Sequence, residues 1–456
     1  MSVDIGPVGS SGPRPPRAVL PHALAAGFDL DRYLDWRRRR DGDPFRVRFP
    51  GFGGAVFTGT AAGAREFFRA PPELLRPPLP NPIEPMVGPA SLILARGERH
   101  RRERALLAPA MHRTRISAYA TVIRDATRAE IDGERTGTPW RPGGRIDARA
   151  AARAMTLRVI LAAVFGIEDR ERLAEFTAAT TAFLESFGTS LFLVPVLRRR
   201  AFGLTGWERF EAARERLDAL IDTEVRRRRA SGDKRDDTDL LGLMLESRYE
   251  DGSAIDDTEL REQLRTLLVA GHETTATALV WALFRLHRTP ATLARLRTET
   301  AGAGSDLEPS EVVELPYLDA VCKETLRLHP PVPIVLRRLT GDFALRGVAL
   351  TAGDTMGLSL RLLHTDPAVF PDPLRFHPDR FVEHRYSPFE YAPFGGGHRR
   401  CIGSALADYE LRIVLATIVD TVRMRLSPRF AAGPPPRTVP HTIAVGPRAA
   451  LTFEID

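Results

Sequence analysis

The chain has 456 residues, of which 43% are hydrophobic and 27% charged, a composition typical of a globular protein with a sizeable core. Its formal net charge is +7, but the arginines are spread along nearly the whole sequence instead of forming one stripe, which argues against nucleic-acid binding. The sequence has two cysteines, which excludes a disulfide framework and favours a reducing, cytoplasmic compartment.

The amino-terminal region has no recognisable targeting segment. It lacks the run of about 18 apolar residues that a membrane anchor requires, and it lacks the basic-then-apolar layout of a secretion signal. Residues 1–21 are rich in glycine, proline and serine, which predicts a disordered tail. We expect residues 22–456 to form a single domain with no membrane anchor.

The first ordered segments are short strands and helices. Residues 45–49 and 55–57 predict a β-hairpin, and residues 61–69 predict a helix. The stretch 71–89 holds eight prolines in nineteen residues, which argues against regular structure. A long loop of this kind in a compact protein is more often a binding loop than a linker.

Helical patterns dominate from residue 97 to residue 245. In the first of these helices, 97–109, His100 and Arg104 are four residues apart and therefore share a face. Taken alone, such a basic turn is usually a solvated surface. Further on, the apolar run Leu191–Leu197 is consistent either with buried core or with a lid over a substrate entrance.

A long helix is expected from Asp257 to His287, with Asp256 and Glu259 arranged as a capping box at its start. At 1.5 Å per residue, such a helix spans about 46 Å. Its middle is unusual, because Ala270 and a glycine precede a histidine, a carboxylate and two hydroxyls. Glycine costs about 1 kcal/mol relative to alanine inside a helix, so something should offset it.

This polar segment has two interpretations. Threonine hydroxyls often bond to the carbonyl one turn earlier and bend the helix. Alternatively, Gly271 leaves room for a small ligand such as O2, Thr274 places a hydroxyl in that space, and Glu273 passes protons inward from solvent. We assign no role to His272 and expect Thr275 to tolerate alanine.

A second motif lies on the helix predicted for residues 316–329, where Glu324 and Arg327 share a face. An exposed pair of this kind contributes a few tenths of a kcal/mol, whereas a buried pair must have both charges paired and hydrogen-bonded. Cys322 on the same helix is expected to be an inert core thiol.

Extended structure is predicted near the carboxyl terminus. Prolines favour an extended segment over 331–338, and strands follow near 343–350 and 355–360. The chain is expected to end in a hairpin formed by 442–445 and 450–455, with its turn at Gly446 and Pro447.

The most distinctive stretch runs from Phe394 through three glycines to Cys401. Glycine lets the backbone adopt positive φ and approach a flat ligand closely. A helix is expected from Ser404 to about Leu426, so Cys401 would lie at its N-terminus, where the helix dipole and Arg399 favour the thiolate. A lone cysteine is usually a buried core residue, but a thiolate held in this way is a soft ligand of the kind that binds haem iron.

The spacing Phe-x-x-Gly-x-Arg-x-Cys-x-Gly resembles the haem-binding loop of the cytochrome P-450 family. The matching residues are Phe394, Gly397, Arg399, Cys401 and Gly403.

Three further motifs resemble the same family, in the same order along nearly the whole chain. They are the helix with His100 and Arg104, the acid–alcohol pair Glu273-Thr274, and Glu324-x-x-Arg327 with its partner Arg380. The resemblance implies a mostly α fold with a small β-rich region.

The resemblance also implies a role for each site residue. The expected site consists of the axial iron ligand Cys401, the cofactor-binding residues Phe394, Arg399, His100, Arg104 and Arg337, the catalytic pair Glu273 and Thr274, and the structural triad Glu324, Arg327 and Arg380. Arg337 is preferred over Arg338 as the partner of the second haem propionate. The triad is expected to hold the segment beneath the haem and to have no chemical role.

The activity implied by the resemblance is haem-thiolate monooxygenation. One oxygen atom from O2 would enter a hydrophobic small molecule of lipid, terpenoid or polyketide type. The cofactor would be haem b, and electrons from NAD(P)H would arrive through an external ferredoxin and ferredoxin reductase. A monomer is expected. The alternatives are a peroxygenase, isomerase or dehydratase of the same fold, and a non-catalytic haem-thiolate sensor.

Two surfaces complete these expectations. The substrate pocket is expected to be lined by residues 77–94, 183–197, 263–270, 331–336 and 440–444. A basic face for an acidic ferredoxin is expected from Arg99, Arg101, Arg102, His398 and Arg400.

Overall fold

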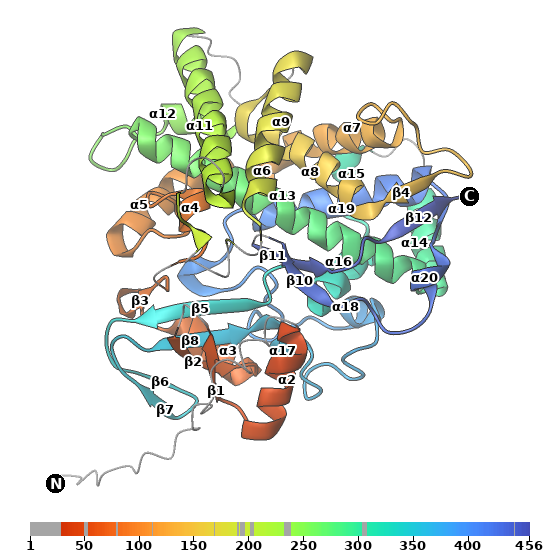
Figure 1. Cartoon of the computed structure of the whole chain (residues 1–456). Coiled ribbons are helices and arrows are strands. Elements are labelled where there is room, and N and C mark those ends of the chain that lie inside the picture. Colours follow the sequence, from red (N-terminus) through yellow and green to blue (C-terminus); the bar gives the residue numbers. More distant parts are fainter. Residues whose placement is uncertain are drawn as a thin grey trace, which may run out of the picture.

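The computed structural model describes residues 29–456 apart from 50–52, 79–80, 112, 168, 189–190, 192–196, 201–204, 232–238, 303–307 and 442. The tail predicted for residues 1–21 therefore lies outside the described residues. Helices predominate and the strands are short, which confirms the mostly α fold with a small β-rich region (Figure 1).

The helices are α2 Leu30–Asp41, α3 Ala61–Arg69, α4 Glu84–Val87, α5 Gly97–Leu107, α6 Arg113–Ile116, α7 Ala120–Ile131, α8 Ala148–Phe165, α9 Arg170–Ser186, α11 Gly206–Ser231, α12 Leu240–Glu246, α13 Asp257–His287, α14 Pro290–Gly302, α15 Pro309–Val312, α16 Pro316–Leu328, α17 Leu360–His364, α18 Asp379–Glu383, α19 Ser404–Thr421 and α20 Pro428–Ala431. The strands are β1 Phe45–Phe49, β2 Gly53–Thr58, β3 Leu75–Arg76, β4 Arg145–Asp147, β5 Ile334–Leu339, β6 Phe343–Leu345, β7 Val348–Leu350, β8 Thr355–Ser359, β9 Met424–Leu426, β10 Thr438–His441, β11 Ala444–Pro447 and β12 Thr452–Ile455.

Helix α13 crosses the centre of the molecule and has the bounds expected from the sequence (Figure 1). Asp256 caps it by accepting hydrogen bonds from the backbone N–H groups of Thr258 and Glu259. By length and composition α13 could cross a membrane, but 83% of its most apolar window is buried inside the protein. It is therefore the core helix of this fold.

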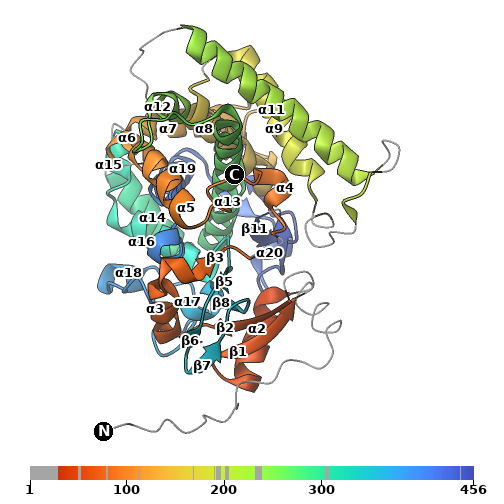
Figure 2. The ribbon, with the colours of Figure 1, turned by 90° about the vertical axis from the view of Figure 1, so that its left-hand side faces the viewer.

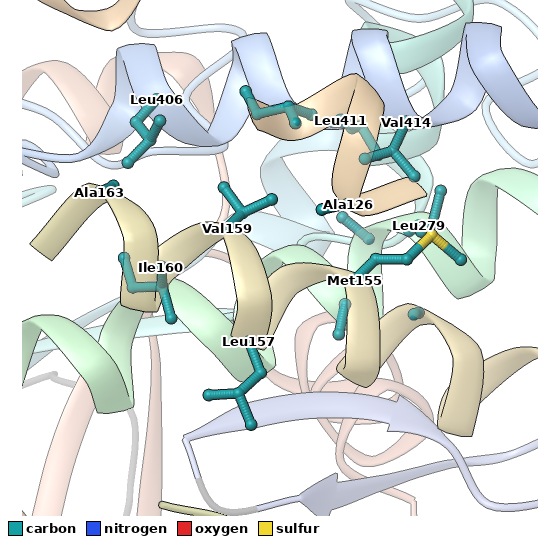
Figure 3. Packing of buried hydrophobic residues seen from close by; sticks show 14 of the residues in the cluster. Ala126, Met155, Leu157, Val159, Ile160, Ala163, Leu279, Leu406, Leu411 and Val414 are labelled. Atoms are coloured by element: carbon teal, nitrogen blue, oxygen red, sulfur yellow. The ribbon is translucent and has the colours of Figure 1, made fainter. Parts of the chain in front are cut away.

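Helix α8 packs along α13 over most of its length and also contacts α7. In Figure 3, Met155 and Val159 of α8 lie among Val414 of α19, Leu279 of α13 and Ala126 of α7. These side chains belong to one continuous core that joins helices from distant parts of the chain. The middle of α13 is thus held between α8 and α19, which fixes its position relative to the loop before α19.

The β-rich region lies at the end of the molecule opposite α9 and α11 (Figures 1 and 2). Its main sheet has the order β1-β2-β8-β5-β3, in which only the β2–β8 pair is parallel. Alternate residues of β2 face different cores, with Val56 packing toward α3, and Ala55 and Phe57 packing toward α2. The hairpin predicted for β1 and β2 is confirmed.

The predicted carboxyl-terminal hairpin is wrong. Strand β11 pairs with β10, which precedes it, and β12 pairs with β4 and β9 instead. Gly446 and Pro447, expected to form the turn, lie within β11. Local sequence patterns predict that a segment is a strand but do not identify a partner far along the chain.

Two other boundaries differ from the predictions. Helix α19 ends at Thr421, because Val422 adopts an extended conformation and Met424–Leu426 pairs with β12. The proline-rich stretch 71–89 is not wholly irregular, since it contains a 3-10 turn, strand β3 and helix α4. Prolines occupy the first or second position of both helical pieces, where the missing N–H group has no cost.

Glu410 of α19 is fully buried, and its Oε1 atom has no hydrogen-bond partner. Burial therefore raises the pKa of this carboxyl well above its usual range. The folded state retains the proton, whereas the unfolded chain releases it above about pH 4.3. Wild-type stability consequently falls as pH rises above that value, and Glu410→Gln should stabilise the protein by about 2 kcal/mol at pH 8 and by less at pH 5.

Urea unfolding at the two pH values measures this effect, with the exposed Glu215→Gln as control. An identical stability difference between wild type and Glu410→Gln at both pH values would contradict a protonated Glu410.

Candidate active site

The loop that carries Cys401 is shaped by glycine. Gly395 and Gly397 adopt positive φ angles of 68° and 66°. A Cβ atom on Gly397 would lie 2.4 Å from the carbonyl oxygen of Phe68, so a larger residue would not fit. The Cys401 N–H donates to the Phe394 carbonyl oxygen at 3.0 Å, which closes the loop just before α19 begins.

The Cys401 side chain is accessible and yet poorly hydrated. Burial raises the pKa of its thiol, and this effect exceeds the lowering by the Gly403 N–H, Arg104 and Arg400. An accessible thiol that has lost most of its hydration faces an internal space and not bulk water. Arg399, which the sequence suggested as the stabilising cation, is not among the groups that act on this thiol.

Arg399 instead ties the cysteine loop to the segment before α5. Its guanidinium donates to the carbonyl oxygens of Leu92 at 3.4 Å and Ile93 at 3.3 Å, and also to that of Ala95. Since backbone carbonyls carry no formal charge, these bonds orient the guanidinium without pairing it with a carboxylate.

Four basic side chains gather beside the loop: His100, Arg104, Arg337 and Arg399. Burial, followed by Arg399, lowers the pKa of His100 to about 3. Burial also lowers the pKa of Arg337 to about 9 and that of Arg399 to about 10. No ion pair found among the described residues involves Arg104, Arg337 or Arg399. This concentration of unpaired positive charge favours an anionic ligand.

The structure distinguishes Arg337 from Arg338. Both lie on β5, whose side chains alternate between the two faces of the sheet, so they point in opposite directions. Arg337 is half-buried, and its guanidinium lies 5.9 Å from the ring centroid of Phe67, whereas Arg338 is exposed. The assignment of Arg337 to the second haem propionate stays a prediction. Phe394, also expected at the site, is half-buried against the main core.

One face of α13 borders an open space. Between residues 262 and 284, the positions that are not buried are Ala270, Gly271 and Thr274. Gly271 and Thr274 follow Ala270 by one and four residues, so the three positions share one side of the helix. A gap in otherwise continuous packing at this point indicates a cavity beside the middle of α13.

On the side that a Cβ atom would occupy, Gly271 packs against α8, since such an atom would lie 2.7 Å from Cδ1 of Ile160. The room expected for a small ligand beside Gly271 stays a prediction. The Thr274 hydroxyl donates to the Ala270 carbonyl at 2.6 Å, which is the structural alternative considered above. Its oxygen still has lone pairs that can accept a hydrogen bond from the cavity.

Glu273 is buried in ion pairs that the sequence analysis missed. Arg149 donates to its Oε1 atom at 2.8 Å, and Arg153 Nε lies 3.2 Å from Oε2. Arg149 also donates to His441 Nδ1 at 2.8 Å, which connects Glu273 to β10. The two arginine side chains are 34% and 22% exposed, so they lie between the carboxylate and solvent. The available signal was the pair Arg149 and Arg153, which lie one turn apart in the alanine-rich first half of α8.

Comparison with known proteins decides the family. A family model described as Cytochrome P450 matches residues 26–448. The chain belongs to the cytochrome P450 family. Cytochrome P450 135B1 of Mycobacterium tuberculosis is 36% identical over 423 residues, which cover 92% of this chain and 86% of that protein. Cytochrome P450 138 of the same species is 33% identical. That match covers 90% of this chain and 91% of that protein.

A solved structure agrees with this assignment. The retinoic acid-bound cyanobacterial CYP120A1 superimposes with a TM-score of 0.81 at 25% sequence identity, over 95% of this chain and 96% of that one. Membership of the P450 family makes the protein an oxidoreductase of the monooxygenase type, which uses haem, O2 and electrons derived from NAD(P)H.

The P450 triad residues Glu324, Arg327 and Arg380 meet in the core. Arg327 donates to both Glu324 oxygens, at 2.6 and 2.8 Å, and both side chains have no exposed surface. Arg327 also donates to the carbonyl oxygens of His364 and Pro373, each at 2.7 Å. Arg380 donates to Glu324 at 3.2 Å. Every charge here is paired and hydrogen-bonded, as a buried pair requires.

The basic face expected on α5 is largely neutralised. Arg99 pairs with Glu103, Arg101 with Glu98 and Glu250, and Arg102 with Asp251. Burial and nearby arginines lower the pKa of His398 to about 4, so it is neutral near pH 7. The charge run in the sequence therefore overstates the positive potential of this surface.

Arg327→Lys tests how much the triad stabilises the fold. A lysine retains the charge but loses the paired contact with Glu324 and most of the bonds to carbonyls. The free energy of unfolding should fall by about 3 kcal/mol. The control is Arg346→Lys, whose partner Glu66 is 36% exposed and whose loss should cost about 1 kcal/mol at most. Urea unfolding midpoints that shift equally in the two variants would contradict this account.

Proposed function

We propose that this cytochrome P450 oxygenates a hydrophobic small molecule, with Cys401 as the axial ligand of haem b. The observation that carries the proposal is the position of Cys401, whose desolvated thiol faces an internal space beside a cluster of unpaired cations. A flat dianionic cofactor with a soft-metal centre matches both features.

The residues beside the loop fit haem as a ligand. Arg399, Arg104, Arg337 and the His100 ring are assigned to the two propionates, since they supply charge or N–H groups with no carboxylate partner among the described residues. When bound, haem supplies the reductive activation of O2 and the transfer of one oxygen atom to the substrate. Cys401 would hold the iron as a thiolate, which is the form of cysteine that binds metals.

Thr274 and Glu273 are assigned to proton delivery. The Thr274 proton is used in the bond to Ala270, so its oxygen acts as an acceptor that holds a water or other donor in the cavity. Glu273 is paired in the interior with two guanidinium groups. Protons from outside reach it past Arg149 and Arg153, between α8 and β10.

The substrate is assigned to a hydrophobic, terpenoid-like class. Ala270, Ile334 and Leu336 are half-buried and apolar, as expected of a pocket lining. CYP120A1, the structural neighbour, is described as binding retinoic acid, an elongated isoprenoid acid. Two of the stretches expected to line the pocket, 183–197 and 263–270, contain residues that are buried in the core instead. Phe183 and Phe187 are fully buried against Phe210 in the core.

Gln263, also expected to line the pocket, is buried and holds the loop before α5. Its side chain accepts from the Leu92 N–H at 3.0 Å and donates to the Ala90 carbonyl at 2.8 Å. The other expected stretch, Leu191–Leu197, lies mostly outside the described residues.

The electron donor is assigned as a small acidic protein such as a ferredoxin, with its reductase. A groove of about 690 Å³ lies against Gly395–Gly397 of the cysteine loop and is lined by Phe389, Arg69 and Arg400. Arg65 and Arg69 are exposed and lie over the Phe389 ring, at 5.2 and 5.3 Å from its centroid. This groove, and not the neutralised α5, carries the exposed positive charge nearest to Cys401 that suits an acidic partner.

Cys401→Ser tests the ligand assignment. The variant should lose the red-shifted Soret band of the reduced CO complex, because a serine hydroxyl does not replace a thiolate as a soft ligand. Cys322→Ser is the matched control, since Cys322 is fully buried in α16 and should leave the band in place. A Cys401→Ser protein that keeps the band would refute Cys401 as the ligand.

Thr274→Ala tests proton delivery with a substrate found by screening for changes in haem spin state. The variant should bind haem and substrate but divert most of its reducing equivalents into hydrogen peroxide, since positioned proton transfer contributes roughly 10²–10⁴-fold in rate. Thr274→Ser should restore coupling. Thr275→Ala, at a buried position, should behave as wild type. The measurement is product and peroxide formed per NAD(P)H, and equal uncoupling in Thr275→Ala would rule out the assignment.

A further inference from the structure

His364 connects the buried Glu324–Arg327 pair to the cysteine loop. It lies at the end of α17 with no exposed surface. Its carbonyl oxygen accepts from Arg327 Nη1 at 2.7 Å. Its ring faces the other way and accepts, at Nε2, the backbone N–H of Ala392 at 2.9 Å. One residue thus receives a hydrogen bond from the triad and another from the segment that leads to Cys401.

The ring has a defined tautomer. Since Nε2 accepts a hydrogen bond, the ring proton resides on Nδ1. Burial, followed by Arg327, lowers the pKa of His364 to about 3, so the ring is neutral throughout the physiological range. Nδ1 has no hydrogen-bond partner among the described residues. A buried N–H group without an acceptor is unfavourable, so the Nε2 bond to Ala392 is the favourable polar contact of this ring.

The bond to Ala392 fixes the start of the cysteine loop. The Ala392 carbonyl accepts from the Gly395 N–H at 2.9 Å, and the Phe394 carbonyl accepts from the Cys401 N–H at 3.0 Å. The neighbouring Tyr391 hydroxyl donates to the Lys323 carbonyl of α16 at 3.0 Å. The loop is therefore attached at its beginning to α16 and α17 and is joined at its end to Cys401.

We propose that His364 is a positioning residue for the haem thiolate, which holds Ala392 so that Cys401 is presented to the iron at ligating distance. The Glu324–Arg327 pair then acts on the metal ligand through His364 as well as through the general stability of the fold. This inference rests on the proposed function, since it concerns Cys401 as the iron ligand.

Three substitutions separate the hydrogen bond from the bulk of the ring. His364→Phe keeps the ring shape and removes the acceptor. His364→Gln places an oxygen near the position of Nε2, whereas His364→Asn places one near Nδ1, where Ala392 does not reach. Leu363→Ala is the control for a general loss of stability, because Leu363 is a fully buried neighbour that makes no bond to the loop.

The measurement is the Soret spectrum of the reduced CO complex of the purified haem protein. His364→Phe and His364→Asn should increase the ratio of thiol-ligated to thiolate-ligated forms about fivefold, as expected for the loss of one hydrogen bond. His364→Gln should restore the wild-type ratio, and Leu363→Ala should lower the unfolding temperature without changing the ratio. Amide exchange at Ala392 in the protein without haem should be faster in the Phe variant than in the Gln variant.

An unchanged ratio in His364→Phe, a failure of the Gln variant to recover, or an equal change in Leu363→Ala would each overturn the proposal. Absence of the red-shifted band in wild type would overturn the proposed function as well. A normal wild-type band with unaffected His364 variants would overturn the role of His364 alone.

Discussion

Arg327 fixes the course of the segment that leads from α17 to the cysteine loop. Its guanidinium is fully buried and donates to both oxygens of Glu324 and to carbonyl oxygens of the segment after α17. A buried cation is tolerated only when every N–H group has an acceptor, so this segment cannot rearrange without leaving a charge unpaired. The segment from His364 to Cys401, in which α18 is the one α-helix, therefore has a fixed course although most of it lacks regular secondary structure.

At the candidate site, in contrast, the half-buried arginines are not paired with carboxylates in the described part of the chain. Arg104, Arg337 and Arg399 are desolvated but have no carboxylate partner among the described residues. One buried arginine is satisfied by the fold, and others are left for a ligand. This contrast separates structural charge from functional charge more clearly than sequence spacing does, because Glu324-x-x-Arg327 and His100-x-x-x-Arg104 are equally short patterns.

Much of the fold and site could be predicted where the signal is local. The limits of α13 follow from its cap and its apolar pattern, and the positive φ angles before Cys401 follow from the glycine run. Predictions that depended on distant partners were less successful. Strand β12 pairs with strands far away in the sequence, and Gly271 packs against Ile160 of another helix. Arg149 was missed as a partner of Glu273 for the same reason, since no local pattern joins α8 to α13.

The unpaired cations beside Cys401 have a consequence for the life cycle of the protein. Several positive charges buried together repel one another, which destabilises the folded chain until an anionic ligand binds. Cofactor loading and folding are therefore thermodynamically linked, and the haem-free chain is the less stable species by the free energy of ligand binding.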